Sequence, residues 1–163
     1  ATRTVNEVDS DDEAPQQRES LCTRLSQAEM EAELERREQL MRTGKSSGVT
    51  DQWRVYTGII NGIRIGSPLR LMVQASAGTG KSFLLTTVYL WCIVNGKRAK
   101  AAVPTGIAAA NVEIEGTEVG AQTIHALLDL NTELESKLDF TKDNAKTAAL
   151  MSLDVLFIDE VCG

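Results

Sequence analysis

A glycine-rich segment near the middle of the chain has the residue types that bind a nucleotide phosphate. Residues 75–82 read Ala-Ser-Ala-Gly-Thr-Gly-Lys-Ser, which ends like the pattern G-x-x-x-x-G-K-[ST] but begins with alanine. Backbone amides of such a turn and of the following helix form an anion-binding nest. Lys81 would neutralise the β- and γ-phosphates, and the Ser82 hydroxyl would ligate magnesium. The predicted nucleotide-binding residues of this segment are Ala77, Gly78, Thr79, Gly80, Lys81 and Ser82.

Two adjacent carboxylates further along the chain form a second candidate group. Residues 154–160 read Asp-Val-Leu-Phe-Ile-Asp-Glu, so a short apolar run leads directly to Asp159 and Glu160. Ligands of open α/β sheets bind at the carboxyl ends of the strands. Asp159 would hold magnesium through water, and Glu160 would take a proton from the attacking water. We therefore predict Glu160 and Lys81 as catalytic residues and Ser82 and Asp159 as metal ligands.

The second carboxylate favours a hydrolytic ATPase over two other classes of nucleotide-binding protein. A GTPase usually shows D-x-x-G at this place and N-K-x-D or T-K-x-D later. Here the glycine after Asp159 comes one position late, at Gly163, and Thr141-Lys142 is followed by an aspartate one position early. A small-molecule kinase would not need Glu160.

The pattern of apolar residues predicts the elements that position these groups. Buried strands are expected over residues 70–75, 99–103 and 155–158. Residues 81–95 are apolar on nearly every side, which predicts a buried helix. Further helices are expected from residue 50 onward and over 105–112, 123–129 and 142–151. Strands that alternate with helices indicate an α/β fold with a parallel sheet and flanking helices.

Composition narrows the classes of protein further. The chain has 163 residues and a net charge of −6, which excludes a uniformly basic nucleic-acid-binding coat. Its charge is unevenly spread, because residues 51–110 hold seven bases and one acid. The three cysteines form no C-x-x-C pair and there is one histidine, so no zinc site is expected. The longest apolar run is too short to span a membrane, so no membrane association is expected.

The chain divides into three parts by composition. Residues 1–25 are acidic and almost free of large apolar side chains, which predicts a disordered tail. Residues 26–48 are expected to form an exposed helix and a linker, because a capping-box pattern at Ser26 precedes a run of strong helix formers. Apolar residues are sparse in that run. Residues 49–163 contain the α/β pattern and every candidate site residue.

Taken together, the motifs resemble the first motor domain of the PIF-type DNA helicases, which belong to superfamily one and are related to helicases of Helitron transposons. The family's phosphate loop commonly reads G-x-A-G-T-G-K-S, and its later motifs A-P-T-G-I-A-A, T-I-H and D-E-x-S-M. The matching segments are residues 75–82 except at Ala75, residues 103–109 except at Val103, residues 123–125, and residues 159–161. Cys162 and Gly163 depart from the last motif.

The resemblance implies a RecA-like fold and an ATP-dependent DNA helicase that uses magnesium and moves 5′-to-3′ on single-stranded DNA. It implies that Gln52 contacts adenine and that the DNA path is lined by Pro104, Thr105, Gly106 and His125. It also implies roles in DNA repair, recombination and telomere maintenance, in a monomeric intracellular protein of the nucleus, or of the mitochondrion, if the source is eukaryotic. Without the resemblance, His125 is as typical of a packed or surface histidine.

Two other interpretations stay open at this point. The chain could be a P-loop ATPase of another class, such as a recombination or loading factor. It could also be a non-catalytic remnant that binds partners through the helix expected over residues 27–42. In the helicase interpretation, residues 49–163 are an incomplete motor domain that is inactive alone as a helicase. A strand encoded after Gly163 would then separate strands 70–75 and 155–159, which we expect about 10 Å apart and unpaired.

Overall fold

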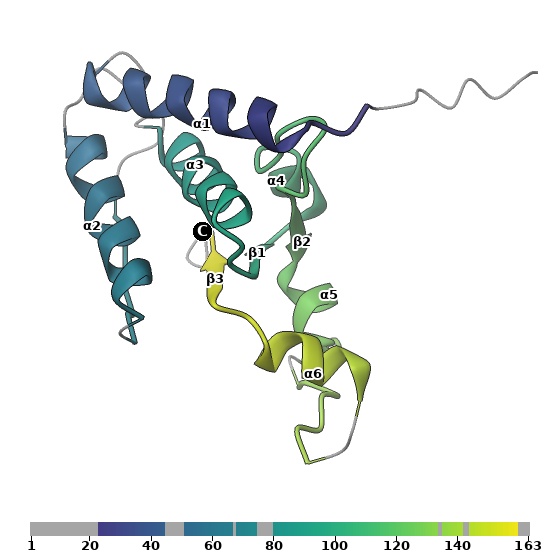
Figure 1. The fold of residues 1–163 in the computed structure, drawn as a ribbon. Coiled ribbons are helices and arrows are strands. Elements are labelled where there is room, and N and C mark those ends of the chain that lie inside the picture. The colour runs from purple at the N-terminus through teal and green to yellow at the C-terminus, as the bar shows by residue number, and fades with distance from the viewer. Residues whose placement is uncertain are drawn as a thin grey trace, which may run out of the picture.

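The computed structural model describes residues 23–44, 51–66, 68–74, 80–133, 135–141 and 144–159. Most of the predicted acidic tail, the predicted linker, the first part of the phosphate loop and Glu160 lie outside these residues. The helices α1 to α6 and the strands β1 to β3 are labelled in Figure 1.

A three-stranded parallel sheet lies at the centre of the described fold, in the order β2-β1-β3. β1 (Ala99–Val103) is the middle strand, between β2 (Ala121–Thr123) and β3 (Val155–Ile158). Helices flank the sheet (Figure 1), so the predicted α/β class with a parallel sheet and flanking helices is confirmed. The short strand β2 was not predicted, because three residues show no recognisable alternation.

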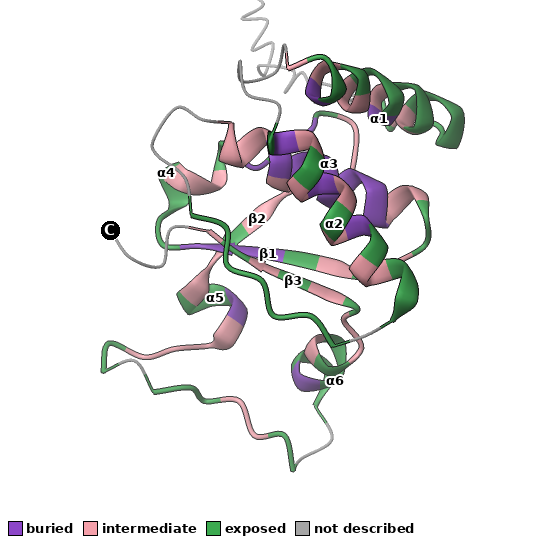
Figure 2. Cartoon of the chain, turned by 90° about the vertical axis from the view of Figure 1, so that its left-hand side faces the viewer, coloured by how far each residue is buried: buried purple, intermediate pink, exposed green. Residues whose placement is uncertain are grey.

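The core lies between β1 and three helices: α1 (Gln27–Arg42), α2 (Asp51–Ile65) and α3 (Lys81–Val94). α3 is the central helix, and Figure 2 shows buried residues gathered on it and on β1. This burial explains its apolar sequence, since a helix that packs on several sides needs apolar residues on several sides. The predicted buried helix is therefore confirmed.

Three short helices continue from the ends of the sheet. α4 (Gly106–Ala109) follows β1, α5 (Ile124–Leu128) follows β2, and α6 (Ala145–Met151) precedes β3. Each begins at a side-chain cap, in which a Thr or Asn oxygen accepts a backbone hydrogen bond from the first turn. The capping residues are Thr105, Thr123 and Asn144.

The prediction of a strand over residues 70–75 is wrong for residues 70–74, which the structure describes. Residues 68–74 form no strand, and Leu71 and Met72 are 55% and 79% exposed. An apolar run forms a strand only if a neighbouring strand supplies hydrogen bonds. The sequence of the run itself does not specify that neighbour. Among the described residues, β3 pairs with β1 and not with this segment, as expected, and both segments line a common cavity. Their expected separation of about 10 Å stays a prediction.

α1 is exposed over most of its surface, but one side of it packs on the core. The capping box between Ser26 and Glu29 is present, but Leu34 and Met41 are buried against the core. These two residues are seven positions apart, so they lie on the same side of the helix and form a narrow seam. Composition alone underestimated how much of α1 is buried, because the charged Arg37 lies between Leu34 and Met41 on the same side of the helix.

Residues 23–25, which the prediction included in the tail, are described and contact the rest of the fold. Leu25 donates its backbone amide to the carbonyl of Gly116 at 2.8 Å, in the loop that follows α4. Gly116 has φ of +77°, and a β-carbon there would lie 3.0 Å from the carbonyl oxygen of Thr23. The close approach of the two backbones therefore requires glycine. Among the described residues, no helix is both long and apolar enough to cross a membrane.

Candidate functional site

The candidate residues that follow the three strands meet at one edge of the sheet. Thr105 follows β1, His125 lies just after β2, and Asp159 directly follows β3. Because the strands are parallel, their carboxyl ends share an edge, and Figure 2 shows α4 and α5 at that same end. The structure therefore brings together residues that lie up to 54 positions apart in the sequence.

Gly80 forms the turn that leads into α3. Its φ of +82° is left-handed, a conformation that glycine adopts without strain. It caps α3 without a side chain, so the first amides of the helix are not covered by a side-chain cap. Lys81 and Ser82 follow in the first turn, both half-buried. This is the arrangement that receives an anionic phosphate at a helix N-terminus.

Gln52 holds the same turn from α2. Its side-chain amide donates to the carbonyl of Gly80 at 2.8 Å, and the residue is buried, with 6% of its surface exposed. The backbone amide of Leu84 donates to the same carbonyl at 3.0 Å. The structure thus places Gln52 in contact with Gly80, at the end of the phosphate loop. Its contact with adenine stays a prediction.

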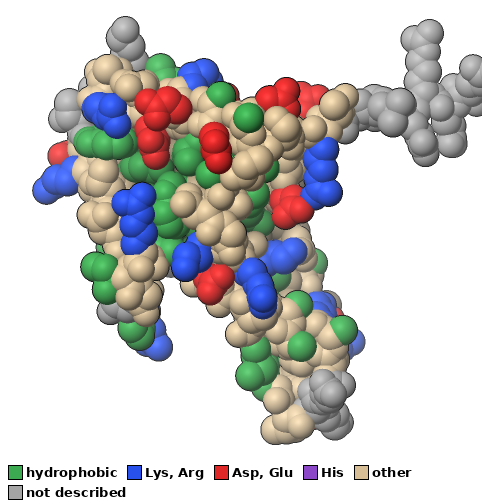
Figure 3. All heavy atoms as spheres, viewed as in Figure 1, with side chains coloured by type: hydrophobic (Ala, Val, Ile, Leu, Met, Phe, Trp, Pro, Cys, Tyr) green, Lys and Arg blue, Asp and Glu red, His purple; other side chains and the backbone are tan. Residues whose placement is uncertain are grey.

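Lys81 and Asp159 line a common cavity of about 630 Å³. β3 forms one wall, residues 68–73 form another, and apolar side chains of α2 and α3 complete the lining. Figure 3 shows hydrophobic side chains between these two helices. The backbone amide of Asp159 donates to Ala102 at 2.9 Å, which fixes the aspartate at the end of β3. A cation and a carboxylate that face one cavity can bind a phosphate and its metal ion respectively.

Four predicted site residues lie outside the described part of the chain: Ala77, Gly78, Thr79 and Glu160. Their assignments stay predictions. The described neighbours on either side, Gly80 and Asp159, fix where the phosphate loop ends and where the carboxylate pair begins.

The predicted DNA-binding residues are exposed. Pro104, Thr105 and Gly106 form the turn after β1, and His125 is exposed on α5, which excludes a packed histidine. Thr105 also has a structural task, because its hydroxyl oxygen accepts a hydrogen bond from the amide of Ala108 at 3.2 Å. A role in DNA binding would therefore be shared with helix capping.

The aromatic residues that could have stacked on bases are mostly core residues. Tyr56, Tyr89 and Trp91 are all buried. Trp53 is half-buried, stacks on Tyr56 at 5.5 Å and lies under the guanidinium of Arg42. Cys92 is also fully buried, and burial raises the pKa of its thiol to about 12, which makes it inert.

Sequence reasoning missed the role of Arg37. Its spacing from Glu33 is typical of an ion pair within a helix, which the structure contains, but its guanidinium also contacts α3. The signal was present in the spacing of Leu34, Arg37 and Met41, which follows the i, i+3, i+7 pattern of one helix side. Thr123 was missed as the cap of α5, although threonine directly before a helix is typical of a cap.

A protein-family model described as an AAA domain matches residues 65–162, more than half of the chain. The matched range begins at the end of α2 and includes the phosphate loop, all three strands and the carboxylate pair. No curated protein and no solved structure matches the chain.

Proposed function

The chain belongs to the AAA-domain family of P-loop nucleotide-binding proteins. From this premise we propose that it acts in an ATP-dependent DNA helicase, in which its own hydrolysis of ATP drives movement along DNA. The observation that carries the proposal is that Lys81 lines the cavity along β3 together with Asp159, which lies at the carboxyl end of that strand. Gly80 turns the chain into α3 at the same place, where helix amides are available for a phosphate.

In the proposed mechanism, each residue has one task. Lys81 neutralises the charge of the β- and γ-phosphates. Ser82 and Asp159 hold the magnesium ion that accompanies ATP, and Glu160 takes the proton of the attacking water. Gln52 adds the contact with adenine that the resemblance implies, from its position beside Gly80.

The exposed residues after β1 and β2 support DNA as the partner of this site. Thr105 and His125 lie at the same sheet edge as Asp159, so a strand of DNA along this edge would lie next to the nucleotide. A threonine hydroxyl and a histidine side chain can both bind a DNA phosphate. Movements of the sheet edge during hydrolysis would then reach the DNA directly.

The finer assignments rest on the resemblance to the PIF-type helicases. They are movement 5′-to-3′ on single-stranded DNA, roles in repair, recombination and telomere maintenance, and a monomeric intracellular protein of the nucleus or mitochondrion. The residues that carry the resemblance and are described, Pro104 to Ala109 and Thr123 to His125, form the ends of β1 and β2 and the helices after them.

An ATPase of another class stays an alternative, because the family match fits it equally well. A binding module built on α1 has less support. The apolar side of α1 packs on α3, and Figure 3 shows acidic side chains on the surface above it. That surface lacks the exposed apolar residues that anchor most protein interfaces.

The rate of ATP hydrolysis with and without single-stranded DNA tests the proposal. We expect DNA to raise the rate in the unaltered protein, and His125→Ala to reduce that stimulation without changing the DNA-free rate. Hydrolysis that is unaffected by DNA would favour the other ATPase class. Absence of magnesium-dependent ATP binding would contradict both.

A further inference from the structure

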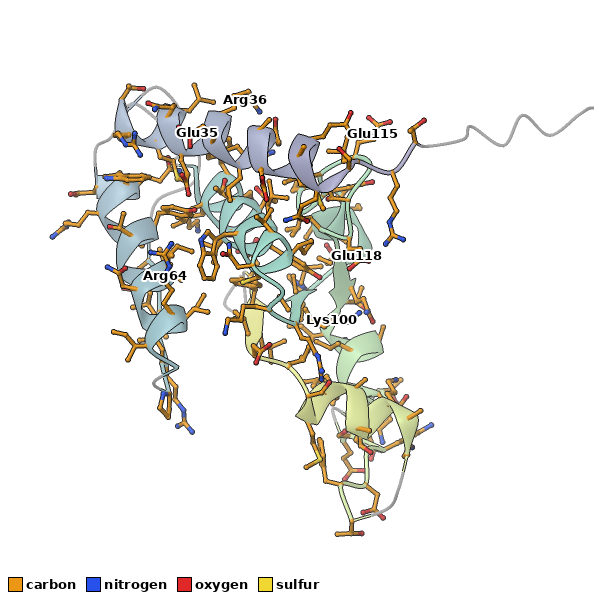
Figure 4. All side chains as sticks on the ribbon, in the orientation of Figure 1. Glu35, Arg36, Arg64, Lys100, Glu115 and Glu118 are labelled. Carbon is orange, nitrogen blue, oxygen red and sulfur yellow. The ribbon has the colours of Figure 1, made fainter. Side chains whose placement is uncertain are left out.

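Arg37 lies in the contact between α1 and α3, where an apolar residue would be expected. It is on the same side of α1 as the buried residues Leu34 and Met41, and its side chain is 13% exposed. α1 precedes the range that matches the AAA-domain family. The neighbouring Arg36 is 57% exposed, and Figure 4 shows it on the side of α1 away from α3.

The guanidinium of Arg37 contacts three residues of α3 within its first two turns. Its Nη1 atom donates to the Thr86 hydroxyl at 3.0 Å and to the Thr87 hydroxyl at 3.4 Å. The group also lies 4.8 Å above the ring of Phe83, in cation–π geometry. Glu33 balances its charge through a hydrogen bond of 2.9 Å.

The two threonines transmit this contact to the first turn of α3. The Thr86 hydroxyl donates to the carbonyl of Ser82 at 2.8 Å, and the Thr87 hydroxyl donates to the carbonyl of Phe83 at 2.6 Å. Each hydroxyl therefore accepts from Arg37 and donates toward the turn that contains Lys81 and Ser82. A hydrogen-bonded chain thus connects α1 with the candidate phosphate site.

α1 also contacts the second helix that supports this site. Glu38 accepts a hydrogen bond from the hydroxyl of Tyr56 on α2. Burial and this contact raise the pKa of Tyr56, so the hydroxyl stays protonated and can donate. Tyr56 is one turn from Gln52, whose amide holds the carbonyl of Gly80. α1 is therefore connected to both helices that hold residues 80–82.

We propose that Arg37 is a positioning residue that holds the first turn of α3 in the geometry that receives the nucleotide phosphates. The inference rests on the proposed function, because the quantity that Arg37 would set is the affinity for ATP. Stability alone would favour an apolar residue at this place, since burying a charged pair is often no better than burying well-packed apolar side chains. Packing alone therefore does not account for the charge of Arg37.

The test compares Arg37→Met with Arg36→Met, which removes an equal charge from the same helix and the same partner, Glu33. Titration with magnesium and a fluorescent ATP analogue gives the affinity, and urea unfolding gives the stability. We expect Arg37→Met to weaken binding about five- to tenfold, as for partial loss of a charged hydrogen bond, while the urea midpoint changes little. Arg36→Met should bind like the unaltered protein.

A second variant keeps the inference testable if Arg37→Met does not fold. Thr86→Val keeps the shape of the side chain and removes the hydroxyl that connects Arg37 with Ser82. It should weaken binding by a similar factor, and the double variant should lose less than the product of the two factors, because both changes break one chain. A purely structural role would lower the urea midpoint and leave the affinity of the folded protein unchanged.

Two results would overturn the inference. Affinity within about twofold of the unaltered protein in both Arg37→Met and Thr86→Val would show that the chain does not affect the site. Independent effects that multiply in the double variant would show that Arg37 does not act through Thr86. If the unaltered protein does not bind the analogue, the proposed function fails first and the inference fails with it.

Discussion

Gln52 and Gly80 show how single residues define the phosphate end of the cavity. Gly80 turns the chain with a positive φ, and the Gln52 amide holds its carbonyl at 2.8 Å. Lys81 and Asp159 then line the cavity from α3 and β3. Their types and order were predictable from the sequence, because the phosphate-loop pattern is local. The bond between Gln52 and Gly80 was not, because it depends on how α2 packs beside α3.

Replacing Gln52 distinguishes loop support from recognition of adenine. Since Gln52 holds the carbonyl of Gly80 and is also assigned the contact with adenine, we expect Gln52→Ala to weaken binding of both nucleotides, and that of ATP more than that of GTP. Competition titrations with the two nucleotides measure this. Equal losses for ATP and GTP would show that the side chain supports the loop and does not recognise the base.

Glu160 is predicted to act in chemistry and not in binding. Glu160→Gln should retain magnesium-dependent ATP binding and lose hydrolysis by a factor of about a hundred, as expected for removal of a general base. The rate is measured with single-stranded DNA present, and Glu133→Gln on the surface is the control. A rate near that of the unaltered protein would move the general base to another residue.

At the scale of elements, prediction succeeded where the pattern is local and failed where the partner is distant. β1, β3 and α3 lie where their apolar patterns placed them. Residues 68–74 also carry an apolar pattern but form no strand, and none of the strands in the described part of the chain pairs with them. α1 was predicted as a helix, but its packing on α3 depends on three residues, one of them charged.

Met41 tests the packing of α1. Its side chain is fully buried against the core, so Met41→Ala should lower the free energy of unfolding by about 2–3 kcal/mol through lost burial and a residual cavity. Urea unfolding measures the change, with the exposed Gln39→Ala as the control. A loss no larger than that of the control would show that α1 does not pack on the core in solution.

At the scale of the whole molecule, the parallel sheet is what unites the two candidate binding functions. The nucleotide residues come from α3 and β3, and the DNA candidates come from the turns after β1 and β2. In the order β2-β1-β3, the two strands that precede the DNA candidates are neighbours and lie on one side of β3. The sequence predicted which residues would reach the carboxyl edge but not their order along it, because strand order is not encoded in any one segment.

The candidate DNA-binding residues and the candidate nucleotide-binding residues lie at different places along this edge. Replacing the first set should therefore change the affinity for DNA and not the affinity for ATP. His125→Ala and Thr105→Ala should weaken binding of single-stranded DNA and leave ATP affinity nearly unchanged. Fluorescence anisotropy with a labelled oligonucleotide measures the first, and ATP titration the second. Thr105→Ser keeps the hydroxyl that caps α4 and is assigned to DNA, so it should bind both ligands like the unaltered protein. A larger effect on ATP than on DNA would contradict this division.

The central claim is that the turn into α3 binds the phosphates of ATP, and the affinity of Lys81→Ala for magnesium-ATP tests it most directly. Lys97 lines the same cavity at the amino-terminal end of β3, so Lys97→Ala is a control of equal charge. We predict that Lys81→Ala loses ATP binding nearly completely and that Lys97→Ala binds like the unaltered protein. Equal affinities of Lys81→Ala and the unaltered protein would contradict the claim.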